Sequence, residues 1–68
     1  MNHKIVIFLE NGKTFAFENV ENVMFDQEKS HVHFEYFGSS HQEKKLAIFD
    51  AANFLGWSVS KGLPIKPI

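Results

Sequence analysis

A chain of 68 residues with eight phenylalanines and no cysteine has room for one small domain, and it excludes disulfide bonds and thiolate metal sites. Its seven lysines are balanced by eight acidic side chains, for a net charge of −1, without the basic stripe that neutralises phosphates. The longest apolar run, Ile5 to Leu9, is too short for a membrane span or a signal-peptide core, so we expect a cytoplasmic protein with no membrane partner.

The first two strands are expected over residues 3–10 and 13–18, joined at Asn11–Gly12, a strong hairpin signal. A two-residue loop would pair Phe8 with Phe15. A three-residue loop, with Gly12 in the left-handed conformation, shifts the pairing by one residue and separates polar from apolar side chains better, so we prefer it. In this register Ile5, Ile7, Leu9, Phe15 and Phe17 share one face, and Val6 and Phe8 stay apolar on the other.

Two further strands are expected over residues 23–27 and 31–37, because polar segments at residues 19–22, 28–30 and 38–42 have turn or loop composition. Alternation directs Val23, Phe25, Val32, Phe34 and Tyr36 inward. It leaves Met24 and Phe37 on the outer face. In a fifth strand, over residues 44–49, either Leu46 and Ile48 or Ala47 and Phe49 face inward, and the pattern leaves this choice open.

A short helical turn is expected after the fifth strand, because Asp50 can cap its start and Gly56 can end it. Residues 57–60 alternate again and predict a last strand. The final segment contains Pro64 and Pro67, which exclude a central strand. We therefore expect a single β domain over residues 1–60 and an extended tail over residues 61–68, with docking of the tail against the domain as the alternative.

This order of elements predicts an all-β protein: a small SH3-like barrel, or a strongly twisted antiparallel sheet of five to six strands, with one short helical turn near the C-terminus. An open antiparallel sheet with one short helix packed on it is the second possibility. The segment from Lys45 to Val59, KLAIFDAANFLGWSV, resembles the strand, 3₁₀ turn and strand that close SH3-like and Sm-like barrels.

The same segment resembles the C-terminal ends of small all-β proteins of Gram-positive bacteria and their phages. That resemblance implies a phage or mobile-element protein that binds and inhibits or modulates a host protein. The chain departs from the Sm pattern, because it starts in a strand rather than a helix and lacks the paired Gly and Asn positions. No functional residue is therefore carried over.

Three ligand-type side chains, His31, His33 and Glu35, alternate along the fourth strand and so share a face. Two imidazoles and a carboxylate are a ligand set that can hold a zinc ion. A solvated outer face is the favoured interpretation, because no fourth ligand is identified. We expect no cofactor and no enzymatic activity. The chain has no cysteine nucleophile and no G-x-S-x-G motif, and its carboxylates are scattered.

The apolar side chains left over on the outer faces point to binding. Phe8, Met24 and Phe37, together with Trp57, are the candidate partner-binding residues. A second small core is the competing interpretation for the first three, and a core anchor is favoured for Trp57. We expect a protein-binding module that also self-associates as a homodimer, which would stabilise so small a domain.

A nucleic-acid-binding small barrel is the alternative function. In it Phe8 and Phe37 would stack on bases, and nearby lysines would contact phosphates. The lysines in question are Lys4, Lys13, Lys29, Lys44 and Lys45. The net charge of −1 argues against this function.

Overall fold

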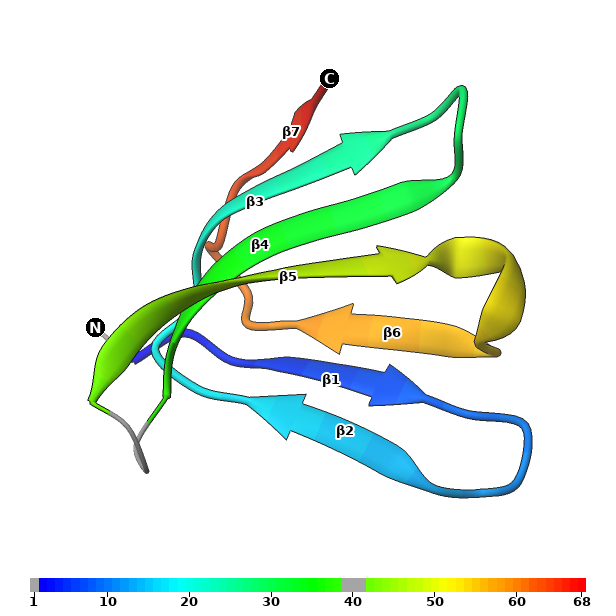
Figure 1. The fold of residues 1–68 in the computed structure, drawn as a ribbon, viewed down its shortest axis with the longest axis horizontal. Helices are drawn as coiled ribbons and strands as arrows, with labels where there is room; N and C mark the ends of the chain where they lie inside the picture. The colour runs from blue at the N-terminus through cyan, green and yellow to red at the C-terminus, as the bar shows by residue number, and fades with distance from the viewer. Residues whose placement is uncertain (1, 39–41) are drawn as a thin grey trace.

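The computed structural model describes residues 2–38 and 42–68, and within them the fold is all-β, as the sequence predicts. Seven strands form two sheets, rather than the five to six strands expected (Figure 1). Sheet A has the order β2-β1-β6, with β1 at Ile5–Phe8, β2 at Thr14–Phe17 and β6 at Gly56–Val59. Sheet B has the order β5-β4-β3-β7, with β5 at Glu43–Asp50, β4 at His31–Gly38, β3 at Glu21–Asp26 and β7 at Ile65–Pro67.

The β1–β2 hairpin has the three-residue loop and the register preferred from the sequence. Ile7 lies opposite Phe15, and Phe8 lies opposite Thr14. The Leu9 N–H donates to the Lys13 carbonyl at 2.9 Å, and Gly12 has φ +82°, a conformation that glycine adopts without a steric penalty. The apolar face of the hairpin is thereby directed at sheet B, and Val6 and Phe8 lie on the opposite face.

Sheet B is built from the β3–β4–β5 meander, and it resolves the choice that alternation left open in β5. Ala47 pairs with Phe34 and packs against the core together with Phe49, whereas Leu46 and Ile48 point outward. The outer face of β5 is therefore as apolar as its inner face.

The start of β3 differs from expectation. The segment at residues 19–22 was expected to be a turn, but β3 begins at Glu21, and an irregularity in its pairing with β4 follows before Met24. Asn19 and Asn22 have φ of 54° and 55°, a left-handed conformation that asparagine tolerates. Between them Val20 is buried, so a segment that looks polar contributes a core residue.

The predicted short helical turn is a 3₁₀ turn at Ala51–Asn53, which carries the chain from β5 in sheet B to β6 in sheet A. The Asp50 carboxylate caps it by accepting a hydrogen bond from the Ala52 N–H at 3.0 Å. β6 then pairs with β1, with Trp57 opposite Ile7.

The C-terminal segment lies in the fold as the edge strand β7, which is the docked alternative for the tail. Val23 pairs with Ile65 in a parallel register, so sheet B is mixed rather than purely antiparallel. The Ile68 N–H donates to the Phe25 carbonyl at 3.0 Å, and Leu63 is buried just before the strand. An edge strand tolerates prolines because one side of it needs no N–H donors.

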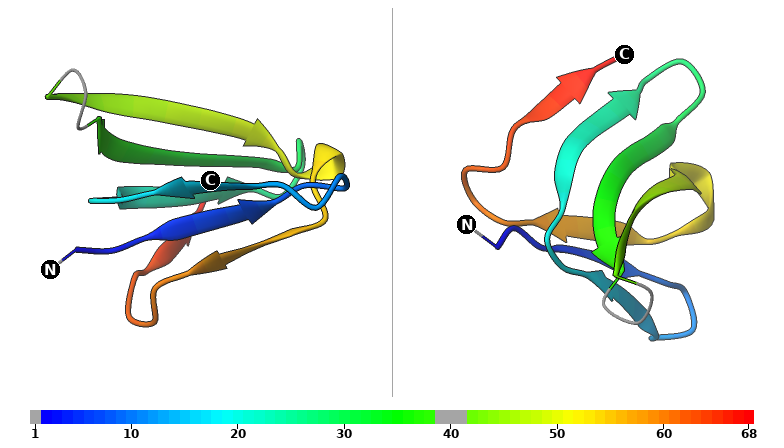
Figure 2. Two further views of the ribbon diagram at one scale, coloured as in Figure 1. Left: turned by 90° about the horizontal axis from the view of Figure 1, so that it is seen from below. Right: turned by 60° about the vertical axis from the view of Figure 1, so that its left-hand side comes forward.

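The core lies between the inner faces of the two sheets, which face each other in Figure 2. Phe17 of sheet A meets the ring of Phe34 of sheet B edge-on, at a centroid distance of 5.1 Å, and Phe34 stacks on Phe49 at 6.1 Å. Such aromatic pairs add to the stabilisation from apolar burial. The buried residues of the core are Ile5, Ile7, Val20, Val23, Val32, Phe34 and Leu63.

Candidate functional site

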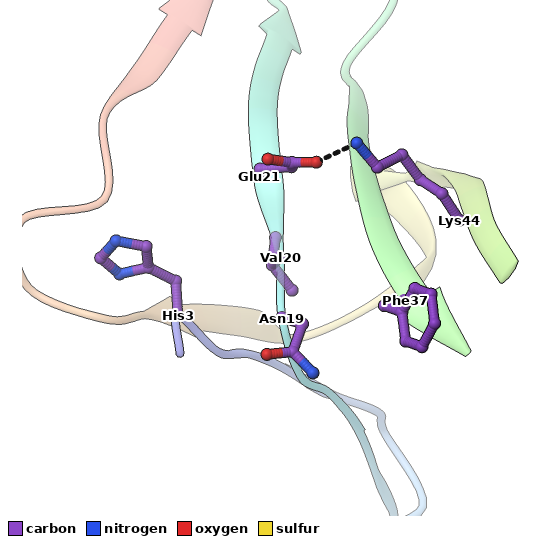
Figure 3. Close-up of a pocket in the computed structure, with 6 residues that line it drawn as sticks. All are labelled: His3, Asn19, Val20, Glu21, Phe37 and Lys44. Atoms are coloured by element: carbon purple, nitrogen blue, oxygen red, sulfur yellow. Dashed lines mark ion pairs between the residues drawn. The ribbon is translucent and has the colours of Figure 1, made fainter. Parts of the chain in front are cut away.

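A pocket of about 350 Å³ opens where the segment before β1 passes the start of β3 and the end of β4 (Figure 3). His3, Asn19, Val20, Glu21, Phe37 and Lys44 line it. Glu21 and Lys44 point toward one another across it and form an ion pair, so its two charged groups satisfy each other. The lining contains no serine or cysteine nucleophile, and the volume is at the low end for ligand sites.

Within the described residues, Lys44 is the ionisable group whose pKa is shifted most clearly by its surroundings. A hydrogen bond from its ammonium to Glu21, and then the charge of Glu21, raise the pKa of Lys44 above its usual 10.5. Glu35 adds to the effect from 3.7 Å. The amide of Asn22 also donates to Glu35, at 3.1 Å, so this end of sheet B carries a linked set of charges on its outer face.

The sequence-predicted partner-binding residues are not brought together on one surface. Phe8 lies on the outer face of sheet A and is 41% exposed, whereas Phe37 lies on the outer face of sheet B and is 43% exposed. Met24 is half-buried on the outer face of sheet B, beside His33 of β4. Trp57 lies on the inner face of sheet A, where it packs against the core.

The three metal-ligand candidates follow one face of β4, as the alternation predicts, but they do not converge. The rings of His31 and His33 are 6.2 Å apart, and Glu35 is engaged by Asn22 and Lys44. In residues 2–38 and 42–68, no group of three histidine, aspartate or glutamate side chains is arranged to hold a metal ion.

The most exposed apolar side chains within a strand belong to β5. Leu46 is 60% exposed and Ile48 is 56% exposed, both on the outer face of sheet B. Ile48 continues a row with His33 and Met24 across three strands. The Nε2 atom of His33 is buried in this row and has no hydrogen-bond partner. Met24, His33, Leu46 and Ile48 all lie on the outer face of sheet B.

The backbone of β5 is open along the side away from β4, because β5 is the terminal strand of sheet B. Just beyond the paired strands, the Ala51 N–H donates to the Ser30 carbonyl at 2.7 Å. Bonding direction alternates along an antiparallel ladder, so the N–H and C=O groups of Lys44, Leu46 and Ile48 point away from β4. In Figure 2, left, β5 runs along the upper margin of the molecule.

Sequence reasoning did not place Leu46 and Ile48 among the binding residues, although a signal was present. Leu46, Ala47, Ile48 and Phe49 form an uninterrupted apolar run, so a half-buried strand must expose two of them whichever face is inward. Which two are exposed depends on how β5 sits over Val32 and Phe34 of β4.

No protein family, no curated protein and no solved structure matches this chain. Within the described residues, no helix has the length and apolar character needed to cross a bilayer. The arrangement of the residues is therefore the basis for a functional proposal.

Proposed function

We propose that this chain is a non-enzymatic protein-binding module that pairs a partner's extended segment with the open edge of β5. Main-chain hydrogen bonds from β5 supply affinity in such β-augmentation, and side chains flanking the edge supply specificity. The resemblance to proteins of Gram-positive bacteria and their phages gives the partner a role: a host protein that is inhibited or modulated when its segment is captured.

The observation that carries the proposal is the coincidence of an open strand edge with exposed apolar side chains. β5 is eight residues long and contains no proline, and its outer face presents Leu46 and Ile48 at more than half of their full exposure. Proteins usually protect an edge of this length, since an unprotected edge is a template for pairing with another chain.

The charges and aromatics give the nucleic-acid alternative less support. Phe8 and Phe37 lie on the outer faces of different sheets, so they do not make one stacking platform. Lys44 is held by Glu21 and Glu35, and Lys4 lies 3.6 Å from Glu18. Nucleic-acid binding would need these lysines at phosphates.

The proposal is tested by affinity capture from a lysate with three matched baits. These are the unaltered chain, a Leu46→Lys, Ile48→Lys double variant, and a Leu55→Lys control, since Leu55 is 69% exposed but lies outside β5. We expect a partner that the unaltered chain and the control retain and the double variant loses, with the same order when the purified partner is titrated.

Equal loss with the Leu55→Lys control would contradict binding through β5. Salt separates the two functions: raising it from about 50 to 200 mM weakens a complex built on phosphate contacts by about 10³-fold or more, whereas an apolar β-augmented complex is little affected.

A further inference from the structure

The open edge of β5 is close to self-complementary, which points to a definite partner. Its sequence, Glu-Lys-Lys-Leu-Ala-Ile-Phe-Asp, begins with one acidic and two basic side chains, ends with an acidic side chain, and has an uncharged centre from Leu46 to Phe49. When two copies of a strand pair antiparallel about a two-fold axis, the beginning of each lies opposite the end of the other. Lys44 of each copy, which also pairs with Glu21 and Glu35 of its own chain, then lies opposite Asp50 of the other copy.

We infer that the segment captured by β5 is β5 of a second copy of this chain, in a two-fold antiparallel pair centred on Ala47. This inference rests on the proposed function, because it uses the same open edge of β5, for which a second copy and a host segment would compete. In this register Leu46 lies opposite the partner's Ile48, and Lys44 lies opposite the partner's Asp50, all on the outer face. The two sheets B become one continuous sheet.

The direction of the backbone groups fits this register. Leu46 and Ile48 both direct their N–H and C=O groups to the open edge, so each meets its counterpart as a hydrogen-bonded pair that exchanges both main-chain bonds. A shift by one residue would place main-chain groups that point to the open edge opposite main-chain groups that point back to β4. It would also place outer-face side chains of one copy opposite inner-face side chains of the other. A shift by two residues would set Lys44 opposite Ile48, or Leu46 opposite Asp50.

The inner face gains cover in the same arrangement. Phe15 of β2 is 49% exposed although it belongs to the core-facing side of sheet A, and its ring lies 6.4 Å from that of Phe49 at the open side of the molecule. The register sets Phe49 opposite the partner's Lys45. The partner's β5 then runs beside the exposed side of the two rings.

The mass of the full-length chain in solution gives the first test, by sedimentation equilibrium up to about 1 mM. We expect twice the chain mass of 7.8 kDa for the unaltered protein, and the monomer mass for Leu46→Pro. The Leu46 N–H faces the open edge, so the proline removes no bond to β4 and the circular-dichroism spectrum should be unchanged. Leu55→Lys is the matched control and should stay dimeric.

The register has a test of its own, because the natural chain contains no cysteine. Ala47 would lie opposite the partner's Ala47 as a non-hydrogen-bonded pair, with Cα atoms about 4.5 Å apart, which suits a disulfide. Ala47→Cys should therefore form a covalent dimer under mild oxidation. Glu43→Cys, on the same face of the same strand but more exposed, should not, because the two-fold axis places its copies roughly 27 Å apart.

The charge contribution is tested by Asp50→Asn, which keeps a good capping side chain for the 3₁₀ turn. We expect a several-fold increase in the dimer dissociation constant and no loss of thermal stability in the monomer.

A monomer at all concentrations, or a dimer that survives Leu46→Pro, would overturn the inference. Covalent dimers from Glu43→Cys but not from Ala47→Cys would overturn the register. If the unaltered chain is monomeric and a different protein is still lost with the Leu46→Lys, Ile48→Lys variant, the proposed function stands without this partner.

Discussion

The two edges of sheet B are protected to very different degrees. β7 is three residues long, is flanked by Pro64 and contains Pro67, and carries Lys66 between its outer residues. Short length, proline and lysine are the features by which proteins keep an edge from pairing with other chains. β5 is eight residues long, and its charges are confined to Glu43, Lys44 and Lys45 at the start and Asp50 at the end.

This difference teaches that exposure alone does not identify an interface. Ile65 of β7 is 44% exposed and Ile68 is 63% exposed, values that overlap those of Leu46 and Ile48. The distinction is that the apolar side chains of β5 flank backbone groups free to pair, whereas Pro67 removes a donor from β7. Edge chemistry and side-chain exposure together select β5.

The largest effect is expected from a change in the core, because the core supports both edge strands, β5 and β7. Phe34 is fully buried at the centre of β4 and meets Phe17 and Phe49. We expect Phe34→Ala to destabilise the fold by about 3–5 kcal/mol through lost burial and a residual cavity. Total stability is roughly 3–10 kcal/mol at this length, so the variant should lose about a third or more of its stability and melt at a clearly lower temperature by circular dichroism. A native melting curve would contradict this account of the core.

An intermediate effect should separate the two edges. Leu63 is the buried anchor that precedes β7, and its N–H donates to the Ser60 carbonyl at 3.1 Å. We expect Leu63→Ala to cost about 2–3 kcal/mol, since the site lies at the margin of the core. Denaturant titration measures this loss.

Amide exchange in the same variant shows where the loss falls. The Ile68 amide, which donates to Phe25, should exchange faster relative to global unfolding, and amides of β5 that bond to β4 should not. Equal acceleration at both edges would show that β7 is not a separate unit of stability.

How far the sequence predicts this fold depends on how clearly each segment separates polar from apolar residues. The β1–β2 register was predictable because one arrangement puts Lys4, Glu10, Thr14 and Glu18 on one face, and because Gly12 suits the left-handed position. The same argument does not decide which face of β5 points inward, because four consecutive apolar residues fit either choice. Only the fit of Ala47 and Phe49 over β4 decides it.

Two further differences have the same kind of cause. Val20 was hidden among asparagines, because a single buried residue between left-handed positions has no periodicity to detect. The segment that forms β7 has the composition of a tail, and only the neighbouring edge of β3 makes it a strand. Of the candidate site, the exposure of Phe8 and Phe37 followed from alternation, whereas the importance of Leu46 and Ile48 required knowing that β5 is an edge.

The smallest expected effect concerns the charged start of β5, and it tests whether Glu21 pairs with Lys44 in solution. The hydrogen bond and the charge of Glu21 raise the pKa of Lys44 above 10.5, so any stability this pair contributes is fully present below pH 10.5 and is lost as pH rises through the higher folded-state value. The contribution to stability is small, because both side chains are more than half exposed and water screens the pair.

We expect the Lys44 Cε resonance to titrate at a lower pH in Glu21→Gln than in the unaltered chain, moving back toward 10.5. Glu43→Gln, which removes a neighbouring carboxylate that forms no ion pair with Lys44, is the matched control and should leave the midpoint unchanged. Equal midpoints in the unaltered chain and Glu21→Gln would mean that Glu21 does not hold Lys44 in solution. The start of β5 would then be as open as its centre, and the contrast with β7 would extend along the whole edge.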